Sequence, residues 1–91
     1  MPHDPDLARL LQSIGANVRR RRLALGYTQE KLAEQAIQDL SYLQRVERGA
    51  TNLSVGVLFA LAKALSVTPA QLLRRARLEP AKRGRPKKKT R

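Results

Sequence analysis

The sequence predicts an all-α protein, a compact bundle of five helices followed by a disordered basic tail. Apolar residues recur at helical spacing in several stretches, capping residues precede these stretches, and glycine or proline separates them. The 91 residues allow one domain with a modest core, because a chain of this size buries only about 60% of its unfolded surface. We expect the domain to span residues 1–78 and the tail residues 79–91.

The first predicted helix begins near Asp6, which is placed to cap it, and ends at Gly26. Gly15 lies in its middle and weakens it by about 1 kcal/mol relative to alanine, so a break or a close contact is expected there. The predicted apolar stripe comprises Leu7, Leu10, Leu11, Ile14, Val18 and Leu25.

Two short helices with a tight corner are predicted over residues 28–49. Thr28 can cap the first of them and Asp39 the second, while Gly49 follows as a stop. In the second helix Leu43 and Val46 face one way. The opposite face is polar and comprises Ser41, Gln44, Arg45 and Arg48.

The last two predicted helices follow a loop at residues 50–53. Ser54 caps the fourth, and Thr68 with Pro69 begins a fifth that is expected to run to about Arg77. The inward-facing residues of these two helices are expected to be Leu58, Leu61, Ala62, Leu65, Leu72 and Leu73. Phe59 is expected in the core or in a dimer contact.

The net charge of +12 indicates an anionic partner, with nucleic acid favoured over an anionic membrane surface. Residues 1–73 carry nine basic and six acidic side chains, whereas residues 74–91 carry ten basic and one acidic. The apolar run from Val55 to Ala62 is too short to cross a bilayer, and the N-terminus does not have the pattern of a signal peptide. We therefore expect no membrane association.

The segment 28–49 resembles the helix-turn-helix of the Cro/C1-type, or XRE-like, family of transcriptional regulators. The resemblance covers roughly residues 14–73, and no single motif in it would be specific alone. It implies a lambda-repressor-like fold and a homodimer that binds double-stranded DNA sequence-specifically in the cytoplasm of a bacterium, at the nucleoid. The matching residues are Thr28-Gln29, Leu32-Ala33, Tyr42-Leu43, Val46 to Gly49, Asn52 to Ser54, and Leu61 to Leu65.

The resemblance implies base contacts early on the outer face of the recognition helix, residues 39–48. Arginine can fork onto guanine, glutamine onto adenine, and serine onto either base, so the polar face suits a major groove. Matched position by position, the base-contacting residues are Leu40, Ser41, Gln44 and Arg45. Arg45 is the first choice for a guanine contact, while Leu40 either contacts a thymine methyl group or is partly buried.

Phosphate contacts are expected where helix N-termini present free N–H groups to anions. The expected residues are Gln29, Lys31, Tyr42, Arg48, Thr51 and Asn52. For Tyr42 the alternative is that its ring packs inside the protein. The family resemblance also implies a structural ion pair between Arg22 and Glu47, which would fasten the first helix to the third.

The corner between the two helices departs from the family pattern. The family usually has a glycine there, suited to positive φ, but this sequence has Ile37, whose β-branched side chain resists that conformation. Either the preceding helix runs further before turning, or the corner has another geometry.

The tail contains Arg83, Gly84, Arg85, Pro86 and Lys87, which resemble the core of an AT-hook. A glycine between two arginines lets the backbone approach the floor of a narrow minor groove, where A·T tracts concentrate negative potential. The alternatives are a basic tail that binds phosphates without preference and a nuclear-localisation cluster, which would require a eukaryotic source.

Two other functions fit parts of the sequence, namely an architectural nucleoid-type DNA-binding protein and an antitoxin-like protein-binding module. An enzyme is not expected, because the sequence has no cysteine, one histidine (His3), no paired-carboxylate motif and no phosphate-binding glycine loop. No cofactor, metal site or small-molecule effector is expected. Three aromatic residues provide little stacking surface for single-stranded nucleic acid.

Overall fold

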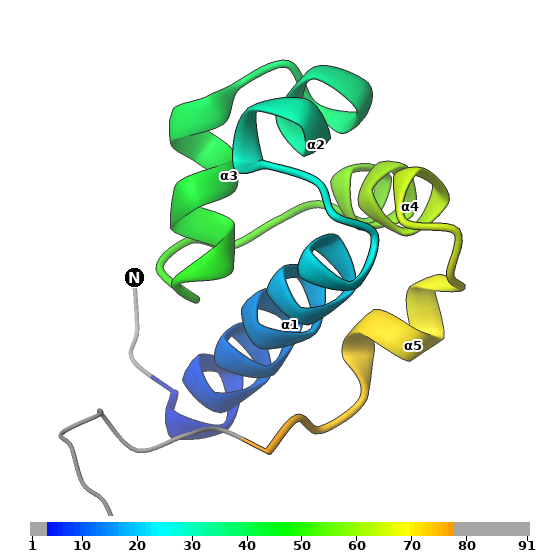
Figure 1. Cartoon of the computed structure of the whole chain (residues 1–91). Helices are drawn as coiled ribbons and strands as arrows, with labels where there is room; N and C mark the ends of the chain where they lie inside the picture. The colour runs from blue at the N-terminus through cyan, green and yellow to red at the C-terminus, as the bar shows by residue number, and fades with distance from the viewer. Residues whose placement is uncertain (1–3, 78–91) are drawn as a thin grey trace, which may run out of the picture.

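The computed structural model describes residues 4–77, which form five helices and no strand. The helices are α1 (Pro5–Ala24), α2 (Gln29–Ala36), α3 (Leu40–Glu47), α4 (Val55–Ala64) and α5 (Pro69–Leu73). Their main contacts close into a ring in the order α1, α3, α2, α4, α5, so that α1 lies between α3 and α5 (Figure 1). The predicted all-α bundle of five helices is therefore confirmed.

One apolar core lies inside this ring, and every helix contributes to it. Leu43 and Val46 of α3 are fully buried, as the spacing of apolar residues predicts. The buried apolar residues are Ile14, Val18, Leu32, Ala33, Leu43, Val46, Leu58, Leu61, Ala62, Leu65 and Leu72. Because α2 and α3 bury one side each in this core, their outer sides are held at the surface of the molecule.

Side-chain caps fix the N-terminus of each helix. Thr28, Asp39 and Ser54 each accept a hydrogen bond from the backbone N–H three residues on, at 3.0, 2.9 and 3.0 Å. Thr68 does the same for α5 and completes a capping box with Gln71. These four predicted caps are confirmed, and they set where the helices begin.

The ends of α1 and α5 differ from the prediction. Asp4, not Asp6, caps α1, because Pro5 takes the first helical position and the Asp4 carboxylate accepts from the Asp6 N–H at 2.8 Å. Leu10 and Leu25 are exposed rather than inward-facing. Helix α5 stops at Leu73, not Arg77, and Leu73 points outward with 41% of its surface exposed. Of Leu72 and Leu73, only Leu72 is buried in the core.

In the corner between α2 and α3, the residue with positive φ is Gln38 and not Ile37. Ile37 has φ −135° and packs half-buried against the core, whereas Gln38 takes φ +56°. Helix α2 thus does not run further. It ends at Ala36, and the left-handed residue is the unbranched Gln38. This separation lets Ile37 keep an allowed conformation and its apolar contacts.

Replacing Gln38 with glycine is expected to raise the free energy of unfolding by about 0.5–1 kcal/mol. The left-handed conformation costs a residue with a Cβ about 1–2 kcal/mol in the folded protein, and glycine avoids this cost. Part of the gain is cancelled, because glycine has greater conformational freedom in the unfolded chain. Urea denaturation of Gln38→Gly beside Ile37→Gly checks this. The second variant should be destabilised, because Ile37 is not left-handed and contributes to the core. Equal effects of the two changes would contradict the assigned geometry.

The segment that follows α5, residues 74–77, is held along α1 by two polar side chains. Asn17 Nδ2 donates to the carbonyl oxygens of Leu72 and Arg74, at 2.9 and 2.8 Å. Ser13 Oγ accepts from the Ala76 N–H at 3.2 Å. Asn17 and Ser13 are both buried, so these bonds form out of contact with bulk water.

Within residues 4–77, no helix is both long and apolar enough to span a membrane. In the same part of the chain, His, Cys, Asp and Glu side chains do not gather in threes in a way that could hold a metal ion. The AT-hook-like residues Arg83, Gly84, Arg85, Pro86 and Lys87, and the boundary expected near residue 78, lie outside the described residues.

Candidate nucleic-acid interface

The outer face of α3 presents polar side chains to solvent. Ser41, Arg45 and Arg48 are exposed, and Gln44 is half-buried between them. Leu43 and Val46 on the opposite side are buried, so the helix cannot rotate without exposing the core. The structure thus brings together the polar residues that periodicity assigned to one face.

Leu40 lies at the first position of α3 and is half-buried, packed against the core. Of the two expectations for this residue, partial burial describes its position in the free protein. Its exposed remainder lies at the end of the helix where base contacts were expected.

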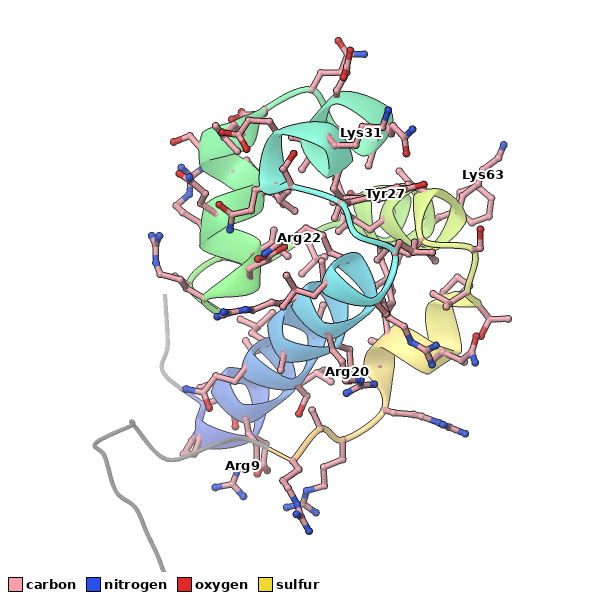
Figure 2. The ribbon with its side chains drawn as sticks, in the orientation of Figure 1. Arg9, Arg20, Arg22, Tyr27, Lys31 and Lys63 are labelled. Atoms are coloured by element: carbon pink, nitrogen blue, oxygen red, sulfur yellow. The ribbon has the colours of Figure 1, made fainter. Side chains whose placement is uncertain are left out.

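A buried ion pair fastens α3 to α1. Arg22 Nε and Nη2 donate to the two carboxylate oxygens of Glu47, at 2.7 and 3.1 Å, and Arg22 Nη1 donates to the Tyr27 carbonyl at 2.9 Å. The two side chains are only 9% and 4% exposed. Figure 2 shows Arg22 leaving α1 toward α3. The Arg22 guanidinium thus donates hydrogen bonds along two of its edges. These bonds fix how closely α3 packs against α1.

Gln29 extends this network from α2 to the outer face of α3. Its Nε2 donates to Glu47 Oε1 at 3.0 Å, and its Oε1 accepts from Gln44 Nε2 at 3.3 Å. The Gln44 amide is therefore held in one orientation. Sequence reasoning placed Gln29 at a phosphate and missed this side-chain role. Its backbone N–H still belongs to the first turn of α2, where such groups lack an intrahelical acceptor.

Tyr42 connects α3 to the loop before α4. Its hydroxyl donates to the Asn52 carbonyl at 3.0 Å, and the Thr51 hydroxyl donates to the same carbonyl at 3.2 Å. The Arg45 guanidinium lies 5.5 Å from the centroid of the Tyr42 ring. Since a phenol has one proton, the hydroxyl cannot donate to a phosphate while it makes this bond. Tyr42 packs in the free protein, which was the second of the two expectations.

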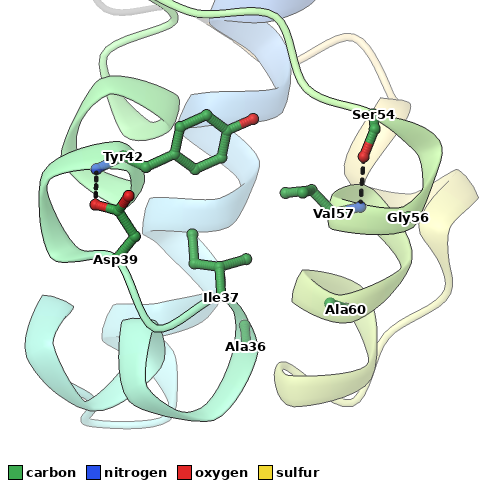
Figure 3. Close-up of a pocket in the computed structure, with 8 residues that line it drawn as sticks. All are labelled: Ala36, Ile37, Asp39, Tyr42, Ser54, Gly56, Val57 and Ala60. Carbon is green, nitrogen blue, oxygen red and sulfur yellow. Dashed lines mark hydrogen bonds between the residues drawn. The ribbon is translucent and has the colours of Figure 1, made fainter.

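A shallow, mostly apolar groove runs beside Tyr42, between the end of α2 and the starts of α3 and α4 (Figure 3). The Tyr42 ring and Ile37 form one side, and Val57 faces them from α4 (Figure 3). Its lining residues are Ala36, Ile37, Asp39, Tyr42, Ser54, Gly56, Val57 and Ala60. The groove opens next to the capped N-termini of α3 and α4, so both helix starts lie on one side of the molecule.

The other expected phosphate contacts lie at the surface around α3. Lys31 on α2 and Asn52 in the loop are exposed, and Thr51 is half-buried. The loop residues reach α3 through Tyr42, whereas Lys31 lies on the neighbouring helix. Two helices joined at a tight corner, with the second exposing a polar face, form a helix-turn-helix, whose second helix enters the major groove in DNA-binding proteins.

Comparisons with known proteins agree with this geometry. A family model described as helix-turn-helix matches residues 18–72. The chain is similar to the restriction-modification controller protein C.AhdI from Aeromonas hydrophila, with 40% identity over 68% of this chain and 94% of that one, and a TM-score of 0.66. It is also similar to the hypothetical transcription factor NHTF from Neisseria, with 34% identity over 82% and 87% of the two chains and a TM-score of 0.71.

A third similar structure is the controller protein C.Esp1396I, solved as a tetramer in complex with its natural 35 base-pair operator. The identity is 32% over 69% of this chain and 83% of that one, and the TM-score is 0.63. The comparison with curated protein sequences gives no significant match. The chain belongs to the helix-turn-helix family of DNA-binding regulators, and the resemblance to XRE-like proteins is confirmed at the level of the family.

Proposed function

We propose that the protein regulates transcription by binding double-stranded DNA sequence-specifically, with α3 in the major groove. The observation that carries this proposal is the polar outer face of α3 on a helix whose opposite face is buried and locked to α1 by the Arg22–Glu47 pair. The eight residues of α3 span about 12 Å, which fits a major groove about 12 Å wide.

Base contacts are assigned to Ser41, Gln44 and Arg45, with Leu40 at the edge of the set. The Gln29 contact uses one N–H of the Gln44 amide and leaves its oxygen and second N–H free. An acceptor and a donor side by side match N6 and N7 of adenine. Arg45 is exposed and positioned over Tyr42, and its fork matches O6 and N7 of guanine.

Phosphate contacts are assigned to the backbone and cations around α3. The N–H groups of the first turn of α2, at Gln29, would bind one phosphate, with Lys31 nearby. The backbone N–H groups of Thr51 and Asn52 would bind another, and Tyr42 would support them by holding the Asn52 carbonyl. Arg48 adds charge at the end of α3. These contacts set position and salt dependence rather than sequence preference.

We further propose that the protein binds as a homodimer in the cytoplasm. Two recognition helices would then lie about 34 Å apart on a near-palindromic site. The similar protein C.Esp1396I binds its operator as a tetramer, which supports an assembly of more than one copy. The tail, residues 79–91, would add a minor-groove contact through Arg83, Gly84, Arg85, Pro86 and Lys87.

Binding-site selection from a random duplex pool with the full chain tests the function. A single enriched, near-palindromic motif supports a regulator. Equal binding of selected and random duplexes at fixed salt would instead support an architectural protein. Repeating the selection with Arg83→Ala and Arg85→Ala tests the tail, since loss of preference for A·T pairs beside an unchanged motif is expected from a minor-groove contact.

Arg45→Ala is expected to weaken binding to the best site by about 1–3 kcal/mol and to relax the preference at one base pair. The measurement is the affinity for the selected site and for each single-base variant of it. Lys31→Ala is the matched control, because it also removes one exposed cation but should weaken binding to all DNA sequences alike. A uniform loss with Arg45→Ala would make Arg45 a phosphate contact.

A further inference from the structure

The net positive charge of residues 4–77 lies outside the segment that contains α2, α3 and α4. Residues 28–65, which contain α2, α3 and α4, carry four basic and four acidic side chains. Residues 4–27 and 66–77 together carry eight basic and two acidic side chains. The segment from α2 to α4 is therefore neutral in sum, although Arg45 and Arg48 are exposed on α3, and the net positive charge of residues 4–77 lies on α1 and on the segment after α5.

Five arginines gather on one side of α1. Arg9 and Arg20 are eleven residues apart, three helical turns, so they leave α1 in nearly the same direction. Ser13 and Asn17 hold residues 74–77 along this side. All five side chains are exposed, and we call them the rear arginine face: Arg9, Arg20, Arg74, Arg75 and Arg77.

This face lies opposite the side of α1 that carries α3. A Cβ built on Gly15 would stand 2.7 Å from the Glu47 carbonyl oxygen, so α3 packs directly on α1 at Gly15. Ser13 and Asn17, each two residues from Gly15, point about 160° away from it around the helix. Figure 2 shows Arg9 and Arg20 leaving α1 on the side away from α3.

The arginines of this face form no ion pair with the described part of the chain and can bind an external anion. Among residues 4–77 the one ion pair is Arg22–Glu47, so no carboxylate in this part of the chain neutralises the rear arginine face. Several guanidinium groups that pair with no carboxylate of residues 4–77 match the regular phosphates of a duplex. A duplex held by α3 cannot reach behind α1, because DNA is stiff over about 150 base pairs.

We propose that the rear arginine face binds the phosphate backbone of a second DNA segment while α3 occupies its own site, so that the protein bridges two segments. The proposal rests on DNA binding by α3. The second segment is bound without sequence preference, since the face offers only guanidinium groups on flexible stems, which suit phosphates rather than base edges.

A bead-capture experiment with the full chain tests bridging. The selected site is immobilised on beads as a biotinylated duplex, protein is bound, and a labelled duplex without the site is added. The test variant has glutamine in place of Arg9, Arg20, Arg74, Arg75 and Arg77. It is expected to capture at least about tenfold less labelled duplex, because each phosphate contact contributes to affinity. The amount of protein held on the beads should stay nearly unchanged.

The matched control replaces Lys63, Lys82, Lys88, Lys89 and Arg91 with glutamine, which removes the same charge elsewhere. It should capture labelled duplex nearly as well as the unmodified chain. Equal losses in the two variants, or a loss only in the control, overturn the proposal. So does stronger competition by RNA or by anionic vesicles than by free duplex. Failure of the unmodified protein to stay on the beads would refute the role of α3 instead.

Discussion

Replacing Glu47 with alanine is expected to lower the free energy of unfolding by about 3–5 kcal/mol, the usual cost of leaving a buried charge without its partner. The change removes the acceptor for two Arg22 nitrogens and for the Gln29 amide. Small domains are stable by only about 5–15 kcal/mol, so the variant should be partly unfolded near body temperature. Urea denaturation followed by circular dichroism measures the loss.

Glu34→Ala is the control for this change, because it removes an exposed carboxylate from α2 and should shift stability by less than about 0.5 kcal/mol. The double variant Arg22→Met with Glu47→Leu should recover part of the loss, since no charge is then left buried. If Glu47→Ala costs no more than the Glu34 control, the pair does not hold α3 on α1.

Gly15→Ala is expected to lower the free energy of unfolding by about 3 kcal/mol and to weaken DNA binding. The added methyl group would overlap the Val46 carbonyl oxygen and stand 2.7 Å from that of Glu47. Both obstacles are backbone atoms, so α1 and α3 would have to move apart, and overpacking of this kind typically costs about 1–3 kcal/mol or more. Thermal unfolding and affinity for the selected site measure the two effects.

The second helical glycine provides an internal comparison for this change. A Cβ at Gly56 of α4 would meet only Ser54 Oγ, at 3.6 Å, which is an ordinary contact. Gly56→Ala should therefore stabilise the protein by about 0.5–1 kcal/mol, through helix propensity alone. Destabilisation by both substitutions would show that close packing at Gly15 is not the cause.

The helices could be predicted because their signals are local. A capping residue, a following stripe and a glycine or proline stop lie within one or two turns, and Thr28, Asp39, Ser54 and Thr68 each provided such a start. Which residues of a helix are covered by other helices depends on contacts between segments that are distant in the sequence. Helix α1 has 20 residues and its two partners have 8 and 5, so its ends overhang and Leu10 stays exposed.

The site could be predicted in part for the same reason. Periodicity placed Ser41, Gln44 and Arg45 on one face of a single helix. The partners of Gln29 and Tyr42 depend on how three elements meet, which no spacing reveals. Ser13 and Asn17 were missed although they carried a signal, because two small polar residues one turn apart beside Ile14 and Val18 indicate buried polar contacts.

Asn17 and Ser13 bond to main-chain atoms of residues 72–76 and to none of the side chains there. An attachment of this kind tolerates substitution, because every residue type except proline offers the same carbonyl and amide groups. The side chains at positions 74, 75 and 77 can therefore change in charge or size without detaching the segment. Residues 74–77 thus form a surface segment on a closely packed domain. Its side chains can be changed to redesign partner preference at little cost in stability.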